Sequence, residues 1–170
     1  MIHVVLYEPE IPGNTGNIIR TCMATGSILH LIEPLGFSMD EKHLRRAGMD
    51  YVLQADIRKY ENWESFTKAN PANHYYYMTR YGKKAPSDFD FTKEEGDIYI
   101  VLGKESTGID REILKGHQET CMRLPMVKDA RSLNLSNCAA IIVYEVLRQL
   151  DYPGLSHKEW LKGEDFLDSI

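Results

Sequence analysis

Cysteine is scarce in this 170-residue chain, which contains only Cys22, Cys121 and Cys138. Three widely spaced cysteines do not make a disulfide framework, and no C-x-x-C or H-E-x-x-H pattern supplies metal-ligand spacing. We therefore expect reduced thiols, no bound metal and a cytoplasmic location. The length suits a single domain over residues 1–170, because a chain of this size buries enough surface to fold without cross-links.

Long hydrophobic runs are missing as well. The longest, Cys138–Tyr144, is far shorter than the about 20 residues that span a bilayer. The apolar run Ile2–Tyr7 follows Met1 directly, with no basic segment and no cleavage site, so it is not a signal peptide. We expect no membrane partner.

The common nucleotide-binding motifs are also absent. The chain has no G-x-G-x-x-G fingerprint and no G-x-S-x-G elbow. Gly103-Lys104 resembles the end of a phosphate-binding loop, but Ile98 and Glu105 occupy the positions that need Gly and Ser or Thr. A nucleotide-like cofactor must therefore be bound by a different kind of loop.

Positive charge is not in excess, since 20 Lys and Arg face 25 Asp and Glu, for a net charge of −5. This balance excludes a protein that coats nucleic acid by bulk positive charge. The acidity is local: Asp88–Asp97 has a net charge of −4 and Asp151–Ile170 one of −3, which leaves the other 140 residues at +2. Local contact with phosphate groups therefore remains compatible with the composition.

Short apolar runs that alternate with helical patterns indicate the fold class. We predict strands at Ile2–Tyr7, Ile28–Ile32, Tyr75–Thr79, Ile98–Leu102 and Cys121–Leu124. We predict helices at Asn17–Ala24, Asp40–Ala47, Asn62–Ala69 and Arg111–His117, and a last, strongly amphipathic helix over Leu135–Leu150. This alternation predicts an α/β domain with a mainly parallel sheet and helices on both faces. The apolar residues of the tail, Leu155–Ile170, predict a short helix that docks on the domain.

The first of three unusual segments is Glu10–Thr21, where a Pro-Gly turn follows the first predicted strand. Asn14 or Thr15 can cap a helix that carries Arg20. Ligands bind α/β sheets at the carboxyl ends of the strands, so this segment is a candidate site. A well-capped helix with a solvated arginine explains the same residues without a ligand.

The second segment, Val101–Gly108, directly follows another strand. Gly103 and Gly108 permit close backbone approach or positive φ, and they flank Glu105. This carboxylate can orient a cation, a hydroxyl or an amino group. A simple turn bounded by glycines is the alternative.

The third segment, Leu124–Asn137, leads from a strand into the last helix. Four small polar residues surround the start of this helix: Ser132, Asn134, Ser136 and Asn137. Because a helix needs only one cap, the surplus donors and acceptors favour a ligand-binding role over a purely structural one.

Together, N-T-G-N-I-I-R-T from Asn14, L-G-K-E-S-T-G from Leu102 and S-L-N-L-S-N from Ser132 resemble the three motifs of the SPOUT methyltransferases. The chain is most similar to the small, single-domain TrmL/YibK type, which methylates the ribose 2′-hydroxyl of the wobble nucleotide of tRNA. The resemblance extends from Leu6–Pro12 through Leu44–Gly48 to Tyr144-Glu145.

This resemblance implies a SPOUT fold with a deep trefoil knot in its C-terminal part. It also implies S-adenosylmethionine as the methyl donor and a homodimer with the active site at the subunit interface, for which we expect the last helix, with Tyr144, to supply part of the contact. By motif match, the catalytic positions are Asn14, Arg20, Glu105, Ser132 and Asn134. The cofactor-binding positions are Met78, Thr79, Leu102, Gly103, Leu124, Met126, Ser132 and Leu133.

Methyl transfer to a hydroxyl is an in-line displacement, so positioning supplies most of the rate. No motif segment contains a histidine, and arginine is a poor base. We therefore expect Arg20 to clamp a substrate phosphate and so help to activate the hydroxyl.

The resemblance implies a tRNA anticodon stem-loop as the partner, with leucine tRNAs as the expected substrates. Tyr81 or Tyr76 can stack on an unpaired base. The basic candidates for backbone contact are His43, Arg45, Arg46, Arg80, Lys83, Lys84, Lys104, Lys128 and Arg131. A SPOUT enzyme that acts on ribosomal RNA or another tRNA position is one alternative. A non-catalytic RNA-binding or nucleotide-binding α/β protein is the other.

Overall fold

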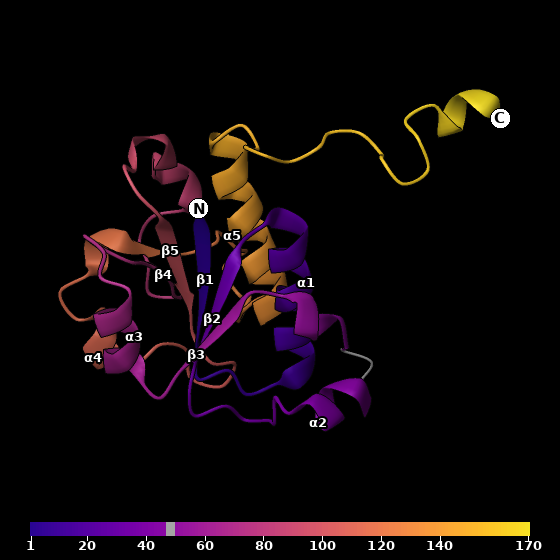
Figure 1. The fold of residues 1–170 in the computed structure, drawn as a ribbon. Coiled ribbons are helices and arrows are strands. Elements are labelled where there is room, and N and C mark those ends of the chain that lie inside the picture. Colours follow the sequence, from indigo (N-terminus) through magenta and orange to yellow (C-terminus); the bar gives the residue numbers. More distant parts are fainter. Residues whose placement is uncertain (47–49) are drawn as a thin grey trace.

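A computed structural model describes residues 1–46 and 50–170 of the chain. Within these residues, six strands form one sheet in the order β3-β2-β1-β5-β4-β6, and every neighbouring pair is parallel (Figure 1). The strands are β1 (Ile2–Tyr7), β2 (Ile28–Ile32), β3 (Ile57–Tyr60), β4 (Tyr76–Met78), β5 (Ile98–Leu102) and β6 (Cys121–Met122). The predicted α/β class with a mainly parallel sheet is confirmed.

Helices lie on both faces of this sheet, as predicted. The α-helices are α1 (Pro12–Thr25), α2 (Glu41–Arg46), α3 (Trp63–Ala69), α4 (Arg111–Leu114) and α5 (Leu135–Gln149). Short 3-10 helices occur at η1 (Asp50–Gln54), η2 (Pro86–Asp88), η3 (Phe91–Lys93), η4 (Gln118–Thr120) and η5 (Phe166–Ser169).

Right-handed connections explain which helix covers which face. From β1 the chain moves to β2 and β3 in one direction across the sheet, and then returns past β1 to β4. Because a right-handed connection changes face when its direction reverses, α1 and α3 lie on opposite faces. The last helix, α5, packs beside α1 (Figure 1). The strand order therefore switches direction between β1 and β5.

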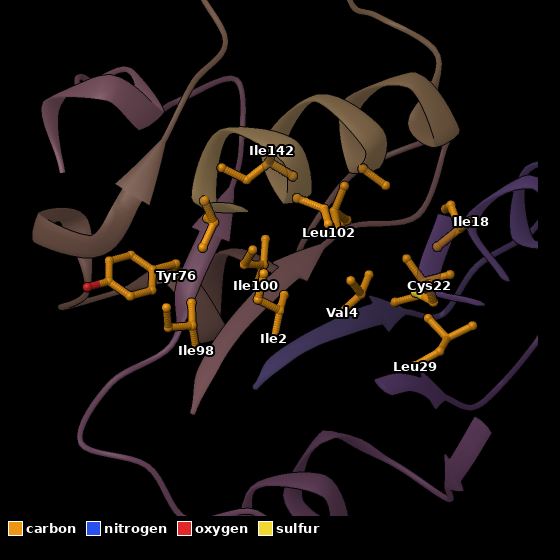
Figure 2. Close-up of a cluster of buried hydrophobic side chains, with 14 of the residues drawn as sticks. Ile2, Val4, Ile18, Cys22, Leu29, Tyr76, Ile98, Ile100, Leu102 and Ile142 are labelled. Carbon is orange, nitrogen blue, oxygen red and sulfur yellow. The ribbon is translucent and has the colours of Figure 1, made fainter. Parts of the chain in front are cut away.

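Two apolar clusters fill the two faces. In the first, side chains of α1 and α5 pack over strand residues that include Val4 and Leu102 (Figure 2). In the second, Phe66 of α3 packs over strand residues that include Val5. Neighbouring residues of β1 thus face opposite clusters, because side chains alternate along a strand. Coverage of both faces is the reason that all six residues of β1 are buried.

Some predicted boundaries differ from the structure. Strand β3 was not predicted, because it is a four-residue edge strand with two exposed cations at its centre, Arg58 and Lys59. Helix α1 begins at Pro12 rather than Asn17, since proline is well accommodated at the first helical position. Ala47, the predicted end of the second helix, lies outside the described residues, as does Gly48.

The prediction that the tail docks on the domain is wrong. Residues 156–170 lead away from the sheet, and only the short η5 helix forms near their end (Figure 1). Trp160, Leu161 and Leu167 are largely exposed. Their apolar side chains predicted burial, but the residues of 156–170 bond mainly to one another, as Lys158 does to Glu164.

Within residues 1–46 and 50–170, none of the helices is both long and apolar enough to cross a membrane. The same residues contain no group of three or more His, Cys, Asp or Glu side chains placed to hold a metal ion.

Candidate functional site

The candidate site lies at the carboxyl ends of β1 and β5, where the strand order switches direction. Connections leave these two neighbouring strands toward opposite sides of the sheet, so a crevice opens between them. The segments that follow the two strands, Glu8–Asn14 and Lys104–Gly108, meet across this crevice.

Glu105 connects the two segments. One of its carboxylate oxygens accepts the backbone N–H of Glu10 at 2.8 Å, and the other accepts that of Ile11 at 3.2 Å. In return, the Glu10 carboxylate accepts both the backbone N–H (2.9 Å) and the hydroxyl (2.6 Å) of Ser106. These bonds from Ser106 lower the pKa of Glu10. The reciprocal pairing holds Glu105 beside the first turn of α1, where negative charge is favoured.

Asn14 extends this connection to the last helix. Its side-chain amide donates to Glu105 at 3.4 Å, and its side-chain oxygen accepts from the amide of Asn134 at 3.0 Å. Three residues predicted as catalytic, one from each motif, therefore form a single network of Glu105, Asn14 and Asn134, which we call the open network. Asn134 also caps α5, because its side-chain oxygen accepts the backbone N–H groups of Ser136 and Asn137.

The predicted cap of the first helix is wrong. Asn14 and Thr15 lie inside α1, and the capping position is Ile11, which makes no side-chain cap. Because Asn14 lies inside the helix, its side chain caps nothing and instead bonds to Glu105 and Asn134.

Two glycines shape the loop around Glu105. A Cβ added to Gly103 would lie 2.3 Å from the carbonyl carbon of Gly108, which only a glycine avoids. Gly108 has a φ of +75°, and its N–H donates to the carbonyl of Lys104 at 2.9 Å. Both predicted functions of these glycines, close approach and positive φ, therefore occur in one tight loop.

The eight predicted cofactor-binding residues all line one cavity of about 110 Å³. They come from the ends of three neighbouring strands and from the segment before α5. These lining residues are Met78, Thr79, Leu102, Gly103, Leu124, Met126, Ser132 and Leu133. Sequence reasoning missed Arg123, Leu135 and Cys138, which also line it. Their positions beside predicted strand or helix ends were the available signal.

A second cavity, of about 680 Å³, continues from the first, and most of the residues that line the first cavity also line the second. It adds the three residues of the open network, and Ser132 lines both cavities. Small-molecule sites usually enclose about 300–1,000 Å³, so the combined space suits a ligand of cofactor size. The small cavity has mainly apolar walls, and the walls of the large one are about equally polar and apolar.

Positive side chains surround the small cavity. Arg80, Arg123 and Arg131 line it. Lys104 lines the larger cavity with Arg80 and Arg131, and it also pairs with Glu8 at 3.4 Å. Within the described part of the chain, no histidine lines either cavity. Burial raises the pKa of the Cys138 thiol, so the sulfur stays protonated at neutral pH and is a poor nucleophile.

Arg20 is not among the residues that line these two cavities. It lies on the exposed face of α1, with its guanidinium carbon 5.8 Å from the ring centre of Tyr51. The Tyr51 hydroxyl in turn donates to the carbonyl of Gly16 at 3.0 Å. Within one chain, four of the five predicted catalytic residues therefore line the larger cavity, whereas Arg20 lies away from both cavities.

The two tyrosines proposed for base stacking have different environments. Tyr76 is buried, and its hydroxyl donates to Glu94, so this half of the prediction is wrong. Tyr81 is 73% exposed and lines the larger cavity. Of the predicted RNA-contacting cations, Arg80, Lys104 and Arg131 line this cavity. Nothing is described for the side chain of Arg45.

The comparisons with known proteins agree on one family. The sequence profile of the SpoU rRNA Methylase family matches residues 1–144. A putative tRNA (cytidine(34)-2′-O)-methyltransferase from Geobacillus stearothermophilus is 49% identical over 155 residues, which cover 91% of this chain and 99% of the relative. The tRNA (cytidine(34)-2′-O)-methyltransferase of Escherichia coli strain K12 is 45% identical over 155 residues, covering 91% and 97%.

Solved structures give the same result. A putative RNA methyltransferase from Bacillus anthracis is 50% identical and superposes with a TM-score of 0.88, covering 94% of this chain and 100% of that chain. The SpoU methyltransferase AviRb from Streptomyces viridochromogenes, in complex with its cofactor S-adenosylmethionine, is 25% identical with a TM-score of 0.69. This match covers 88% of this chain and 60% of that one.

Proposed function

Because the chain belongs to the SpoU rRNA Methylase family, we propose that it transfers a methyl group from S-adenosylmethionine to the ribose 2′-hydroxyl of nucleotide 34 of tRNA. Relatives 49% and 45% identical are named for this reaction on cytidine 34, and the family predicted from the motifs is confirmed. The observation that carries the proposal is that the eight motif-matched cofactor residues line one cavity, which continues to the open network. Within this reaction, leucine tRNAs are the proposed substrates.

The lining residues fit this cofactor. Met78, Leu102 and Leu124 provide apolar walls for a flat ring, and Gly103 lines the same cavity. Polar and charged groups of the larger cavity suit a ribose and an amino-acid carboxylate. When bound, S-adenosylmethionine supplies a methyl group on a positively charged sulfur. Ser132 and Leu133 line both cavities, so we assign them to hold the cofactor between the two.

The chain's own residues then position the RNA. Asn134 is fixed by its bond to Asn14 and by its capping of α5, so its place beside the cavity is set before the ribose arrives. Such positioning supplies much of the rate of an in-line displacement. A guanidinium keeps its proton in proteins, so Arg20 acts as a clamp on phosphate and not as a base.

Arg20 reaches the site of a second subunit in this proposal. Its exposed position on α1, away from both cavities of its own chain, supports such an arrangement. Beside α1, helix α5 exposes Ile141 and Tyr144, which are half-exposed apolar residues suited to a homodimer interface. The partner is thus the anticodon stem-loop of a tRNA bound across two subunits.

We also propose the deep trefoil knot that the family resemblance implies. The segment between β6 and α5 supports it: β6 is at one edge of the sheet, whereas α5 packs beside α1. To connect them, residues 123–134 pass the carboxyl ends of β4 and β5, where Leu124 and Met126 line a cavity with Met78 and Leu102. Mechanical extension from both ends leaves a knotted chain shorter than its full contour length, and recovery of the full length would contradict the knot.

Mapping methylated positions tests the function. Bulk tRNA and ribosomal RNA are incubated with the protein and isotopically labelled S-adenosylmethionine, and 2′-O-methyl groups are then located by sequencing. We expect label at nucleotide 34 of leucine tRNAs and none without protein. Label in ribosomal RNA or at another tRNA position would replace the proposed substrate, and no label in any RNA would overturn the enzymatic function.

Mixing two inactive variants tests the contribution of Arg20 across the interface. Arg20→Ala and Asn134→Ala proteins are unfolded together and refolded as a mixture. If Arg20 completes the partner's site, half of the dimers are mixed and each has one intact site, so about a quarter of wild-type activity returns. If Arg20 acts within its own chain, every site keeps a defect and no activity returns.

A further inference from the structure

A groove of about 720 Å³ lies beside the candidate site, between the turn that follows β4 and helix α4. It adjoins the larger cavity, because Thr79 and Tyr81 line both. The proposed methyl transfer does not use this space, which we call the side groove. An RNA that enters the larger cavity therefore has a second concave surface next to it.

A rigid turn presents the ring of Tyr81 to this groove. The N–H of Thr79 donates to the carbonyl of Met122 on β6 at 2.9 Å, and the N–H of Gly82 donates to the carbonyl of Thr79 at 3.1 Å. A Cβ added to Gly82 would lie 2.5 Å from the carbonyl carbon of Met122, so the turn lies directly against β6. The backbone of Tyr81 is thus fixed while its ring is 73% exposed. Such preorganisation lowers the entropy lost on binding.

Charged side chains line the groove beside this ring. Arg111 and Lys115, four residues apart along α4 and its end, line it together with Glu112, which leaves one net positive charge among the three. Arg80 lines the neighbouring larger cavity, and its guanidinium carbon lies 5.9 Å from the ring centre of Tyr81. Gln118 adds a side-chain amide, which can both donate to and accept from the edge of a base.

This composition matches an unpaired nucleotide. Single-stranded RNA is recognised by stacking of its bases on aromatic side chains, combined with cations that follow its backbone. The continuity with the larger cavity places a bound nucleotide next to the methylated one.

We propose that the side groove binds the nucleotide that neighbours the methylated one, with its base stacked on Tyr81 and its phosphate at Arg111 and Lys115. This inference rests on the proposed function, since it takes the substrate to be RNA. It makes Tyr81 a determinant of substrate affinity that is separate from cofactor binding.

The test uses anticodon stem-loops that carry the fluorescent base 2-aminopurine immediately 5′ or 3′ of the target nucleotide. We expect wild-type protein and Tyr81→Phe to quench one of the two RNAs, because stacking quenches this base, and Tyr81→Ala to leave both bright. Loss of a stacking partner should also raise the KM for RNA by roughly 10-fold or more, with kcat and the Kd of S-adenosylmethionine changed by less than about twofold. Arg111→Ala combined with Lys115→Ala should raise KM and reduce its salt dependence.

Trp160→Ala is the matched control, since it removes an 81%-exposed aromatic ring from the tail. Quenching in Tyr81→Ala equal to that of wild type, or an unchanged KM for RNA, would overturn the inference. A groove that binds a peptide would give this result, because neither the quenching nor the KM for RNA would change. Quenching requires no turnover. A wild-type protein that quenches without methylating therefore contradicts the proposed function alone, whereas one that methylates without quenching contradicts the side groove alone.

Discussion

Two networks of polar side chains in this protein have similar components and opposite accessibility. The open network of Glu105, Asn14 and Asn134 lies at the carboxyl ends of the strands and lines a cavity. The second network lies against the aromatic residues of the sheet face that α3 covers, and we call it the buried histidine chain. Its members are Asp97, His3, His30, Tyr60 and Asn70.

The buried histidine chain satisfies every member when both imidazoles are neutral. His3 donates to Asp97 at 3.0 Å and accepts from His30 at 2.8 Å. His30 then accepts from the Tyr60 hydroxyl at 3.0 Å, and Tyr60 accepts from the Asn70 amide at 3.0 Å. A proton added to His30 would remove the acceptor from Tyr60.

The comparison teaches that clustered titratable groups do not by themselves mark an active site. Burial lowers the pKa of His3, and burial together with the neighbouring His3 lowers that of His30 to about 4. Shifted pKa values often indicate catalytic groups, but here the shifted histidines are buried and line neither of the two site cavities nor the side groove. Access to a ligand, and not titration, distinguishes the two networks.

The largest expected effect is the loss of activity in Arg20→Ala. Removing the charged group that clamps the substrate phosphate and helps to activate the 2′-hydroxyl should lower kcat/KM by roughly 1,000-fold. The Kd of S-adenosylmethionine, measured by calorimetry, should stay within about twofold, because Arg20 does not line the cofactor cavity. Arg58→Ala, which removes an exposed arginine paired with Asp56, is the matched control. Methylation that survives within a few fold would exclude Arg20 from the site.

The next effect concerns the buried histidine chain and pH. The folded-state pKa of His30 lies near 4, below its unfolded value of 6.5, so its contribution to stability is complete above pH 6.5 and is lost as the pH falls toward 4. A shift of this size corresponds to about 3 kcal/mol in the free energy of unfolding between pH 7 and pH 4. Urea titrations across this range measure it.

His30→Gln provides the matched variant, because an amide can hydrogen-bond without titrating. We expect a weaker pH dependence of unfolding and methylation at pH 7 within about twofold of wild type, once the variant is folded. Equal pH dependence in the two proteins would show that another group controls acid unfolding. A large loss of activity in folded His30→Gln would show that the buried histidine chain also contributes to activity, as the open network does.

Glu105→Gln has a smaller expected effect and tests the open network for stability. The amide replaces one of two oxygens that accept backbone N–H groups of Glu10 and Ile11, so one bond is lost. The free energy of unfolding should fall by about 1–2 kcal/mol. Methylation should fall by roughly 10-fold, since Asn14 and Asn134 depend on Glu105 for their positions. Chemical denaturation and initial rates measure the two losses, and lower stability at full activity would make Glu105 purely structural.

The smallest expected effect is a gain in stability. The hydroxyl of Thr15 on α1 is fully buried and has no hydrogen-bond partner among the described residues. Thr15→Val removes this unsatisfied group at nearly constant volume, and the free energy of unfolding should rise by about 1 kcal/mol. A loss of stability of similar size would indicate that the hydroxyl has a partner such as a bound water.

The elements that the sequence predicted well have strong local signals. Strands β1, β2 and β5 are mainly apolar runs because both of their faces are covered, and only His3 and His30 interrupt them. Strand β3 has no such run, since it lies at the edge of the sheet. The cofactor-binding positions were placed from motif resemblance, and the structure brings them around one cavity.

Contacts between distant segments could not be predicted in the same way. His3 and His30 are 27 residues apart, and His3 and Asp97 are 94 apart, so no local pattern indicates that they meet. The position of Arg20 away from both cavities depends on how α1 packs beside α5, and no local pattern predicts that packing. The cap at Asn14 was wrong because α1 begins at Pro12, which places Asn14 inside the helix.

The bond between Asn134 and Asn14 has a consequence for protein synthesis, because the two residues are 120 positions apart. At a translation rate of about 5–20 residues per second, Asn14 leaves the ribosome's catalytic centre roughly 6–24 s before its partner is made. Asn14 therefore lacks its partner until Asn134 has been made, and no nascent chain that ends before Asn134 contains the complete open network. Newly made protein can act on RNA only after its synthesis is almost finished.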